Sequence, residues 1–168
     1  MSRRVKLALV AVLALGAGGA YVSNGLATPA NVVSQNAMGP YSFAPFNVRV
    51  RSSMPPWWRV HLKAHGQSDV YWVDNVFGPG TTTGWHSHPG PSFILVISGT
   101  VTNYEGGNGH CSITTYTKGQ GFMDAGGNDI HMIKDNTADP AETIALQVLP
   151  KGALRRIDEP DPGTCPGE

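Results

Sequence analysis

The chain has 168 residues and a formal net charge of zero, and only 14 % of its residues are charged, whereas 21 are glycine and 13 are proline. This length fits one domain with an adequate core. The composition favours short strands joined by tight turns over long surface helices, which are rich in Glu, Lys and Ala. Basic residues form no run beyond the N-terminus, so nucleic acid is not expected as a partner.

The first 22 residues have the anatomy of a targeting segment. An apolar stretch from Leu7 to about Ala17 follows a positive start, which is formed by Arg3, Arg4 and Lys6. The stretch is shorter than the roughly 20 residues of a membrane span, which predicts a signal peptide over residues 1–22 and a secreted or otherwise extracytoplasmic protein. Two sites, after Ala20 and after Ala30, fit cleavage. The alternative is an uncleaved N-terminal anchor, and only then would a membrane be a partner.

The strand signals lie between residues 46 and 150, where runs of β-branched and aromatic residues alternate with turns that contain glycine and proline. The expected strands are 46–51, 57–64, 69–77, 92–97, 100–104, 112–117, 130–133 and 143–149. Short strands with a turn signal about every 8–12 residues predict an all-β sandwich or barrel. Residues 23–45 show no periodicity and are expected to form a linker or loosely draped arm, and residues 151–168 a tail packed on the outside.

Three histidines carry the chemistry that the sequence suggests. His86 and His88 are separated by one residue, so on a strand both rings point to the same face and can reach one ion. His131 lies in the apolar stretch Ile130–Ile133, where a buried imidazole needs a hydrogen-bond partner or a metal. A metal site needs a third and usually a fourth donor. The hypothesis of a metal site is therefore better supported by the pair and the single histidine together than by either alone.

The spacing around these histidines resembles the two sequence motifs of the cupin family. The first motif is matched by Gly80, His86, His88 and Gly99, and the second by Gly119, Gly126, Gly127 and His131. The resemblance covers roughly residues 68–150. It implies a double-stranded β-helix, or jelly-roll, barrel over residues 46–150, with one divalent metal ion inside one mouth of the barrel.

The chain departs from the cupin pattern at Ser92, where the family usually carries a glutamate ligand. A serine hydroxyl is a poor ligand for a divalent ion at neutral pH, so the resemblance leaves His86, His88 and His131 as the metal ligands. In the second motif, Ala125 stands where proline is expected. Imidazole suits Fe, Zn, Ni, Cu or Mn, so the identity of the ion stays open.

The interior next to the metal is expected to be apolar with one hydroxyl group. Ser92, Ile94 and Val96 share one face of their strand and should line the pocket if the family register holds. Ser92 would then orient a substrate or a water molecule beside the ion. Trp85 points to the opposite side from His86 and is expected to pack outside the barrel mouth.

Three functional hypotheses follow from this site. The first is a metal-dependent enzyme of small molecules, an oxygenase or a lyase or isomerase; within the cupin family, three-histidine iron centres are associated with dioxygenases acting on thiols or diketones. The alternative is a non-catalytic extracytoplasmic module that binds a small ligand or a metal, because the pocket face shows no acid–base residue. The third is a barrel without metal whose histidines pair by hydrogen bonds. Cupins often dimerise, so a homodimer is a further partner to test.

Cys111 and Cys165 are the two cysteines of the chain. An even count in an exported chain is consistent with one disulfide, which would tie the C-terminal tail to the barrel. Two free, buried thiols are the alternative. The remaining histidines, His61, His65 and His110, have no partner at metal-ligand spacing and are expected on the surface.

Overall fold

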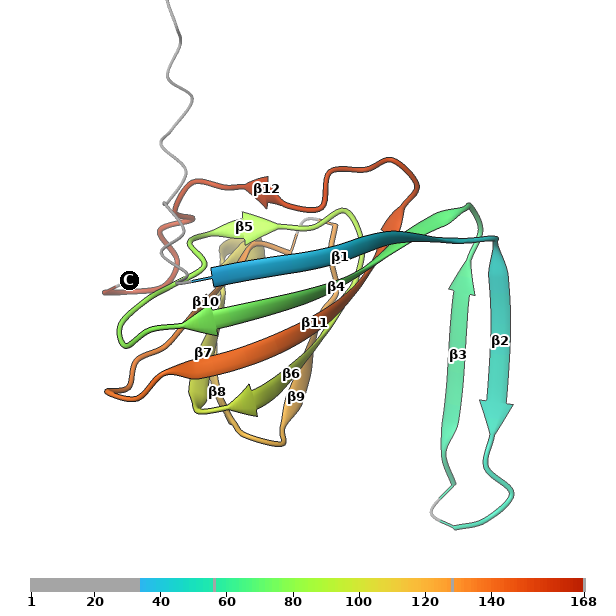
Figure 1. Ribbon diagram of the computed structural model, residues 1–168, viewed down its shortest axis with the longest axis horizontal. Helices are drawn as coiled ribbons and strands as arrows, with labels where there is room; N and C mark the ends of the chain where they lie inside the picture. The colour runs from blue at the N-terminus through green and yellow to red at the C-terminus, as the bar shows by residue number, and fades with distance from the viewer. Residues whose placement is uncertain (1–33, 56, 128, 168) are drawn as a thin grey trace, which may run out of the picture.

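The computed structural model describes residues 34–55, 57–127 and 129–167 of the chain. This part consists of strands, turns and one short 3-10 turn (Figure 1). The predicted signal peptide and both cleavage sites lie outside the described residues. Within the described ranges, no helix has the length and apolar character needed to cross a membrane.

Twelve strands follow one another along the described chain. They are β1 (Ser34–Phe43), β2 (Phe46–Arg51), β3 (Arg59–Ala64), β4 (Ser68–Phe77), β5 (His86–Ser87), β6 (Ser92–Ser98), β7 (Thr100–Glu105), β8 (Ser112–Thr117), β9 (Gly121–Asp124), β10 (His131–Lys134), β11 (Ala141–Pro150) and β12 (Ile157–Asp158), and the 3-10 turn η1 is Gly107–Gly109.

The strand order is that of a double-stranded β-helix. One antiparallel sheet has the order β1-β4-β11-β6-β9 and the other the order β12-β5-β10-β7-β8. Each strand of β4 to β7 pairs with a strand of β8 to β11 in reverse order, as β4 with β11, β5 with β10, β6 with β9 and β7 with β8. Two halves of chain wound together in this way form a jelly roll. The predicted all-β, cupin-type fold is therefore confirmed.

The core lies between the two sheets because alternate residues of each strand point inward. Phe77, Val96 and Ala141 from the first sheet pack against Val101 and Ile133 from the second. A smaller cluster joins three residues of the first sheet, namely Val73, Ile94 and Ala145. Along β11 buried and more exposed residues alternate over the whole strand, which is the period of two that a half-buried strand requires.

The turn between β6 and β7 explains the last glycine of the first motif. Gly99 has a positive φ of 70°, a conformation that side chains rarely adopt. A Cβ atom at this position would lie 2.5 Å from the carbonyl oxygen of Pro140 and 2.8 Å from the Cβ of Ala141. Only glycine fits, so the motif spacing fixes where β6 ends.

The segment expected as a linker is in part a strand. Ser34–Phe43 forms β1, which pairs with β4 along the edge of the first sheet. The pattern of β1 gives no signal because its residues from 35 to 43 are exposed, so backbone hydrogen bonds to β4 hold it rather than an alternating apolar face.

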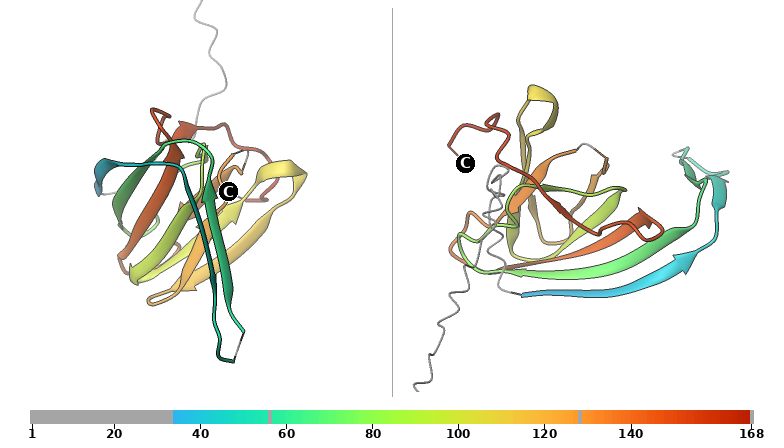
Figure 2. Two further views of the ribbon diagram at one scale, coloured as in Figure 1. Left: turned by 90° about the vertical axis from the view of Figure 1, so that its right-hand side faces the viewer. Right: turned by 90° about the horizontal axis from the view of Figure 1, so that it is seen from above.

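The hairpin of β2 and β3 was expected within the barrel but stands apart from it (Figures 1 and 2). Its apolar side chains gather on one face, where Val48 is opposite Leu62 and Val50 is opposite Val60. The alternate positions carry polar side chains, with Arg49 opposite His61 and Arg51 opposite Arg59. The alternation of apolar and polar residues therefore predicts the two strands correctly. It does not predict which part of the protein, or which partner, packs on their apolar face.

The C-terminal tail pairs with the second sheet, and its last described residues are anchored. β12 pairs with β5, and a disulfide joins Cys111 to Cys165 with 5.1 Å between the Cα atoms. The predicted disulfide is thus present. Trp85 is buried with Cys165 in one apolar cluster together with Tyr104 and Met132, so the indole packs beneath the tail.

Candidate metal centre

The three predicted histidines meet inside the barrel. His86 on β5 is the direct cross-strand partner of His131 on β10, which brings their Cβ atoms to within about 4.5–5.5 Å. His88 follows two residues after His86 and presents its ring on the same side. The ring centroids lie 4.3 Å apart for His86 and His131, 4.8 Å for His86 and His88, and 5.4 Å for His88 and His131. All three side chains are buried.

Hydrogen bonds hold two of the rings in a fixed orientation. His86 donates from Nδ1 to the carbonyl oxygen of Gly84 at 2.8 Å, and His88 donates from Nδ1 to the carbonyl oxygen of Arg155 at 2.7 Å. Since a carbonyl only accepts, each Nδ1 carries the proton and each Nε2 keeps its lone pair. Metal-binding histidines commonly hold their second nitrogen in this way.

The donor set fits a divalent ion. One ligand nitrogen from each ring lies within 4.8 Å of the other two. Metal–nitrogen bonds of about 2.0–2.1 Å allow two ligand nitrogens to lie at most about 4.2 Å apart, so a pair separated by 4.8 Å has to close by at least about 0.6 Å. The Nδ1 atom of His131 is buried and makes no hydrogen bond of good geometry among the described residues, and a carboxylate oxygen of Asp124 lies 3.5 Å from it.

Burial keeps these imidazoles in the form that binds metal. It is the largest cause that lowers the pKa of His86 well below its ordinary value, and it lowers the pKa of His88 to about 4. The neighbouring His131 is the second cause for both groups. Both rings are therefore neutral at pH 7, and a neutral imidazole is the metal ligand.

A buried carboxylate next to the histidines was missed by the sequence analysis. Asp124 on β9 is the cross-strand partner of Ser92, whose hydroxyl donates to Asp124 Oδ2 at 3.4 Å. Its Oδ1 lies 3.5 Å from His131 Nδ1, and its Oδ2 lies 3.9 Å from His88 Nε2. Strand β9 thus places a carboxylate beside the position where cupins usually carry glutamate. The available signal was its place directly before the second motif's Ala125-Gly126-Gly127.

The charge of Asp124 is set by opposing effects. Burial raises the pKa of this carboxyl, but the neighbouring His131 and the backbone N–H of Gly126 lower it by more, so the pKa lies below its ordinary value. Gly126 donates to Asp124 Oδ1 at 2.8 Å. Asp124 is therefore an anion at neutral pH, with its Oδ1 atom 3.5 Å from the ring nitrogen of His131.

The cavity at the histidines is small and its lining mixes polar and apolar side chains, so it is more polar than the expected apolar pocket with one hydroxyl group. Its volume is 30 Å³. Its lining consists of Gln35, Val73, Asn75, Thr83, His86, His88, Ser92, Ile94, His131, Ile133, Ala145, Gln147, Arg155 and Arg156. Ser92 and Ile94 line it as predicted. Val96 does not, because it lies further along β6 in the core cluster with Phe77.

The polar side chains that line the cavity come from segments that are far apart in the sequence, and no sequence motif links these segments. Gln35 belongs to β1, Asn75 to β4, Gln147 to β11, and both Arg155 and Arg156 to the tail. Sequence reasoning placed β1 and the tail outside the barrel. It therefore could not bring their side chains to the centre.

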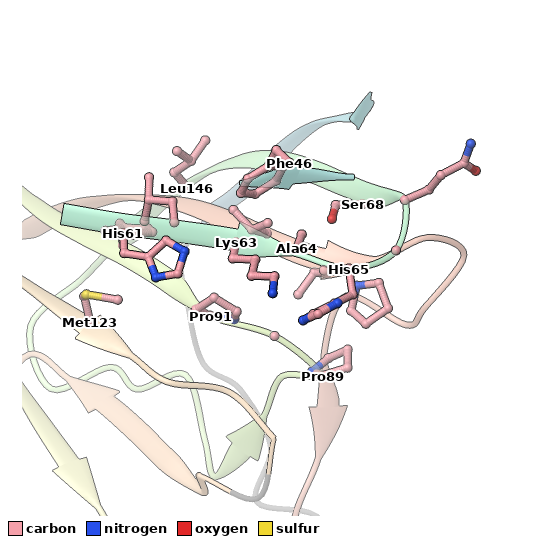
Figure 3. Close-up of a pocket in the computed structure, with 18 residues that line it drawn as sticks. Phe46, His61, Lys63, Ala64, His65, Ser68, Pro89, Pro91, Met123 and Leu146 are labelled. Atoms are coloured by element: carbon pink, nitrogen blue, oxygen red, sulfur yellow. The ribbon is translucent and has the colours of Figure 1, made fainter. Parts of the chain in front are cut away.

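A larger hollow is separate from the metal centre. It measures 630 Å³ and lies between the β2–β3 hairpin and the barrel, with Phe46, Pro91, Met123 and Leu146 among its lining residues (Figure 3). None of His86, His88 and His131 lines it. The predicted surface position of His61, His65 and His110 is confirmed, since all three are exposed.

Solved structures to which the chain is similar are cupin superfamily proteins. A cupin superfamily protein of Desulfitobacterium hafniense is 12 % identical, with a TM-score of 0.42 over 48 % of this chain and 67 % of that chain. A conserved protein with a double-stranded β-helix domain from Klebsiella pneumoniae is 22 % identical, with a TM-score of 0.46 over 69 % of this chain and 85 % of that chain.

Enzymes are also among the similar structures. A mutant of the salicylate 1,2-dioxygenase from Pseudoaminobacter salicylatoxidans is 22 % identical, with a TM-score of 0.41 over 46 % of this chain and 22 % of that chain. No protein-family model and no curated protein matches the sequence. The fold rests on the strand order above, and fold and site together define a cupin-type barrel with a buried three-histidine cluster.

Proposed function

We propose that His86, His88 and His131 hold one divalent metal ion, and that this ion is the working centre of an enzyme of small molecules, an oxygenase or a lyase or isomerase. The observation that carries the proposal is the convergence of three buried imidazoles, with one ligand nitrogen of each within 4.8 Å of the others. The three candidate ligands are all imidazoles, and Fe, Zn, Ni, Cu and Mn all suit imidazole.

The residues around the histidines orient the ligands and offer hydrogen bonds to a substrate. A bound divalent ion supplies a Lewis acid or, as Fe(II), a site for chemistry with dioxygen. Asp124, close to Nδ1 of His131, orients that ring. Gln147 donates from Nε2 to Ser92 Oγ at 3.5 Å, so these two side chains offer hydrogen bonds to a substrate or water molecule in the cavity. Ile94 and Val73 close the apolar wall.

The test combines metal analysis with turnover. The mature protein and its His131→Ala variant are purified and analysed for bound metal, and the Fe(II)-loaded protein is assayed for oxygen uptake with thiols and diketones. His65→Ala removes an exposed histidine and serves as the matched control. We expect one ion per chain in the wild type and the control, loss of the ion in His131→Ala, and substrate-dependent oxygen uptake that follows the metal.

Two other results of this experiment would replace or contradict the proposal. Stoichiometric metal that depends on His131, with no conversion of any candidate substrate with any of the five metals, would replace the enzyme by the non-catalytic binding module. Wild-type protein without stoichiometric metal after loading would contradict the metal centre and leave a barrel whose histidines are structural.

We further propose that the protein works outside the cytoplasm. The targeting pattern of residues 1–22 and the Cys111–Cys165 disulfide support this location, because disulfides persist in oxidising compartments. Cell fractionation followed by N-terminal sequencing is expected to find the protein outside the cytoplasm, starting at Tyr21 or Asn31. An intact N-terminus in the membrane fraction would support the uncleaved anchor, and cytoplasmic protein would contradict export.

A further inference from the structure

The C-terminal tail brings two arginines to the histidine cavity. The carbonyl oxygen of Arg155 accepts the hydrogen bond from His88 Nδ1, so the tail backbone touches the metal centre itself. The side chains of Arg155 and Arg156 both line the cavity that His86, His88 and His131 line. Neither arginine belongs to the barrel strands, and both precede β12.

Hydrogen bonds hold the two guanidinium groups in place. Arg156 donates from its Nη2 to the carbonyl oxygen of Thr83 at 2.7 Å and from its Nε to Asp158 at 2.6 Å. Arg155 donates to the side-chain oxygens of Gln147 and Gln35. The partners of Arg155 come from β11 and β1, so its side chain is held against two strands of the first sheet.

The two guanidinium groups are the charged side chains among the described residues that line the cavity, since His86 and His88 are neutral at pH 7. The nearby Asp124 carboxylate faces the histidines, with Oδ1 3.5 Å from His131 Nδ1, and pairs with neither arginine. Asp158 pairs with Arg156 but has a 59 % exposed side chain, which weakens the pair through solvent screening. Arg155 contacts neutral amide oxygens and, in the part of the chain described, forms no salt bridge with a carboxylate.

A partly buried cation without a counter-charge calls for an anionic partner. Arginine binds a carboxylate through two parallel N–H donors, and this geometry makes it the common residue at carboxylate sites. The cavity of 30 Å³ has room for about two water-sized groups. The charge of the two arginines thus favours an anionic ligand, and the small volume of the cavity favours a small ligand.

We propose that the ligand of this site is a small carboxylic acid, bound as the carboxylate by Arg155 and Arg156 beside the histidine centre. The proposal deepens the proposed function, since it places the substrate's carboxylate at the same site. The tail is the specificity element: β12 and the Cys111–Cys165 disulfide fix its course, and its two arginines carry the charge that distinguishes an acid from a neutral molecule of the same shape.

The experiment compares isosteric probes that differ in charge. Binding of acetate and acetamide, and of formate and formamide, is measured by calorimetry at pH 7 on metal-loaded protein and on chelator-treated protein. We expect each carboxylate to bind at least tenfold more tightly than its amide. Arg155→Gln and Arg156→Gln should each weaken acetate binding at least tenfold in the metal-loaded protein, whereas Arg59→Gln on the distant hairpin should leave it unchanged.

Controls separate a failed proposal from a damaged protein. Thermal unfolding shows whether each variant is folded, and Arg155→Lys, which keeps the charge but loses the two-pronged donor, should recover part of the affinity. Equal binding of acetate and acetamide, no acetate binding at all, or acetate binding that is the same in both glutamine variants as in the wild type would overturn the proposal. Metal content is measured on every sample, so absence of metal would be recognised separately as failure of the proposed function.

Discussion

His88 combines a place in the proposed metal centre with a buried, uncharged ring. Its pKa of about 4 in the folded chain lies below the ordinary 6.5 because of burial first and the neighbouring His131 second. The unfolded chain therefore takes up this proton more readily. For a group of this kind, stability is complete above about pH 6.5 and is lost as the pH falls towards 4.

We predict that metal-free protein loses free energy of unfolding on acidification through this window. The contribution of His88 is at most about 3 kcal/mol, from 1.36 kcal/mol per pKa unit. Urea unfolding at pH 7.0 and pH 4.5 measures the loss, and His88→Gln, which has no group to titrate, should show a smaller one. Equal losses in the two proteins would show that His88 is not held neutral by the fold.

Asp124 gives a second prediction at the residue scale. Asp124→Asn keeps the shape of the side chain but removes the charge that faces His131, so metal affinity should fall by roughly 10- to 100-fold without abolishing binding. A competition titration with a chromogenic chelator measures the affinity. Asp139→Asn changes an exposed carboxylate and is the matched control. An Asp124→Asn variant that binds metal like the control would remove Asp124 from the centre.

The residues of the site differ in how well the sequence reveals them. His86 and His88 share a strand face, and His131 stands out as an ionisable ring in an apolar strand, so these three are predictable from local pattern. Asp124 and Arg155 are not, because each reaches the centre through the barrel topology or the course of the tail. The local sequence around such residues resembles that of ordinary turn and tail residues.

Among the elements, the tail links stability to the site. The Cys111–Cys165 disulfide spans 54 positions of sequence, and closing such a loop restricts the unfolded chain by about 4 kcal/mol in the entropic account. The same bond fixes the end of the segment that carries Arg155 and Arg156.

We predict that Cys165→Ser lowers the free energy of unfolding by about 2–4 kcal/mol and weakens acetate binding, because the arginines lose one of their anchors. Chemical unfolding and calorimetry measure the two effects. Cys111→Ser breaks the same bond and should give matching values. Unchanged stability in both variants would mean that the bond does not constrain the chain, and unchanged acetate affinity would show that β12 alone holds the tail.

The strands are predictable to the extent that they bury an alternating face. β4, β6 and β11 each bury one side and were anticipated within a few residues. β1 was not anticipated, since its residues from 35 to 43 are exposed and only the backbone ladder to β4 holds it. β5 and β12 have two residues each, which is too short for a pattern to be visible.

On the scale of the whole molecule, the β2–β3 hairpin remains without a cover. Val48, Val50 and Leu62 are each nearly half exposed, and a two-stranded hairpin is marginal in water without a body to pack on. The strands follow from the sequence pattern and the jelly-roll arrangement from the resemblance to the cupin motifs, whereas the placement of this hairpin depends on surfaces that alternation does not specify. The homodimer expected from the resemblance would give its apolar face a partner.

We therefore predict a dimer in solution that depends on this face. Light scattering after size-exclusion chromatography should give twice the 17.8 kDa chain mass for the uncleaved form, or twice the mature mass after cleavage. Val48→Lys with Leu62→Lys should give a monomer, whereas Arg49→Ser on the opposite face should stay dimeric. A wild type that runs as a monomer at all concentrations would refute the dimer.

The central claim is that rings from two distant stretches of chain hold one ion together. Calorimetric titration of metal-stripped protein with Zn²⁺ tests it most directly, on the wild type and on His86→Ala and His131→Ala separately. The account predicts one ion per chain in the wild type and at least a hundredfold weaker binding in each variant. Binding in His131→Ala at wild-type strength, or no stoichiometric binding in the wild type, would contradict it.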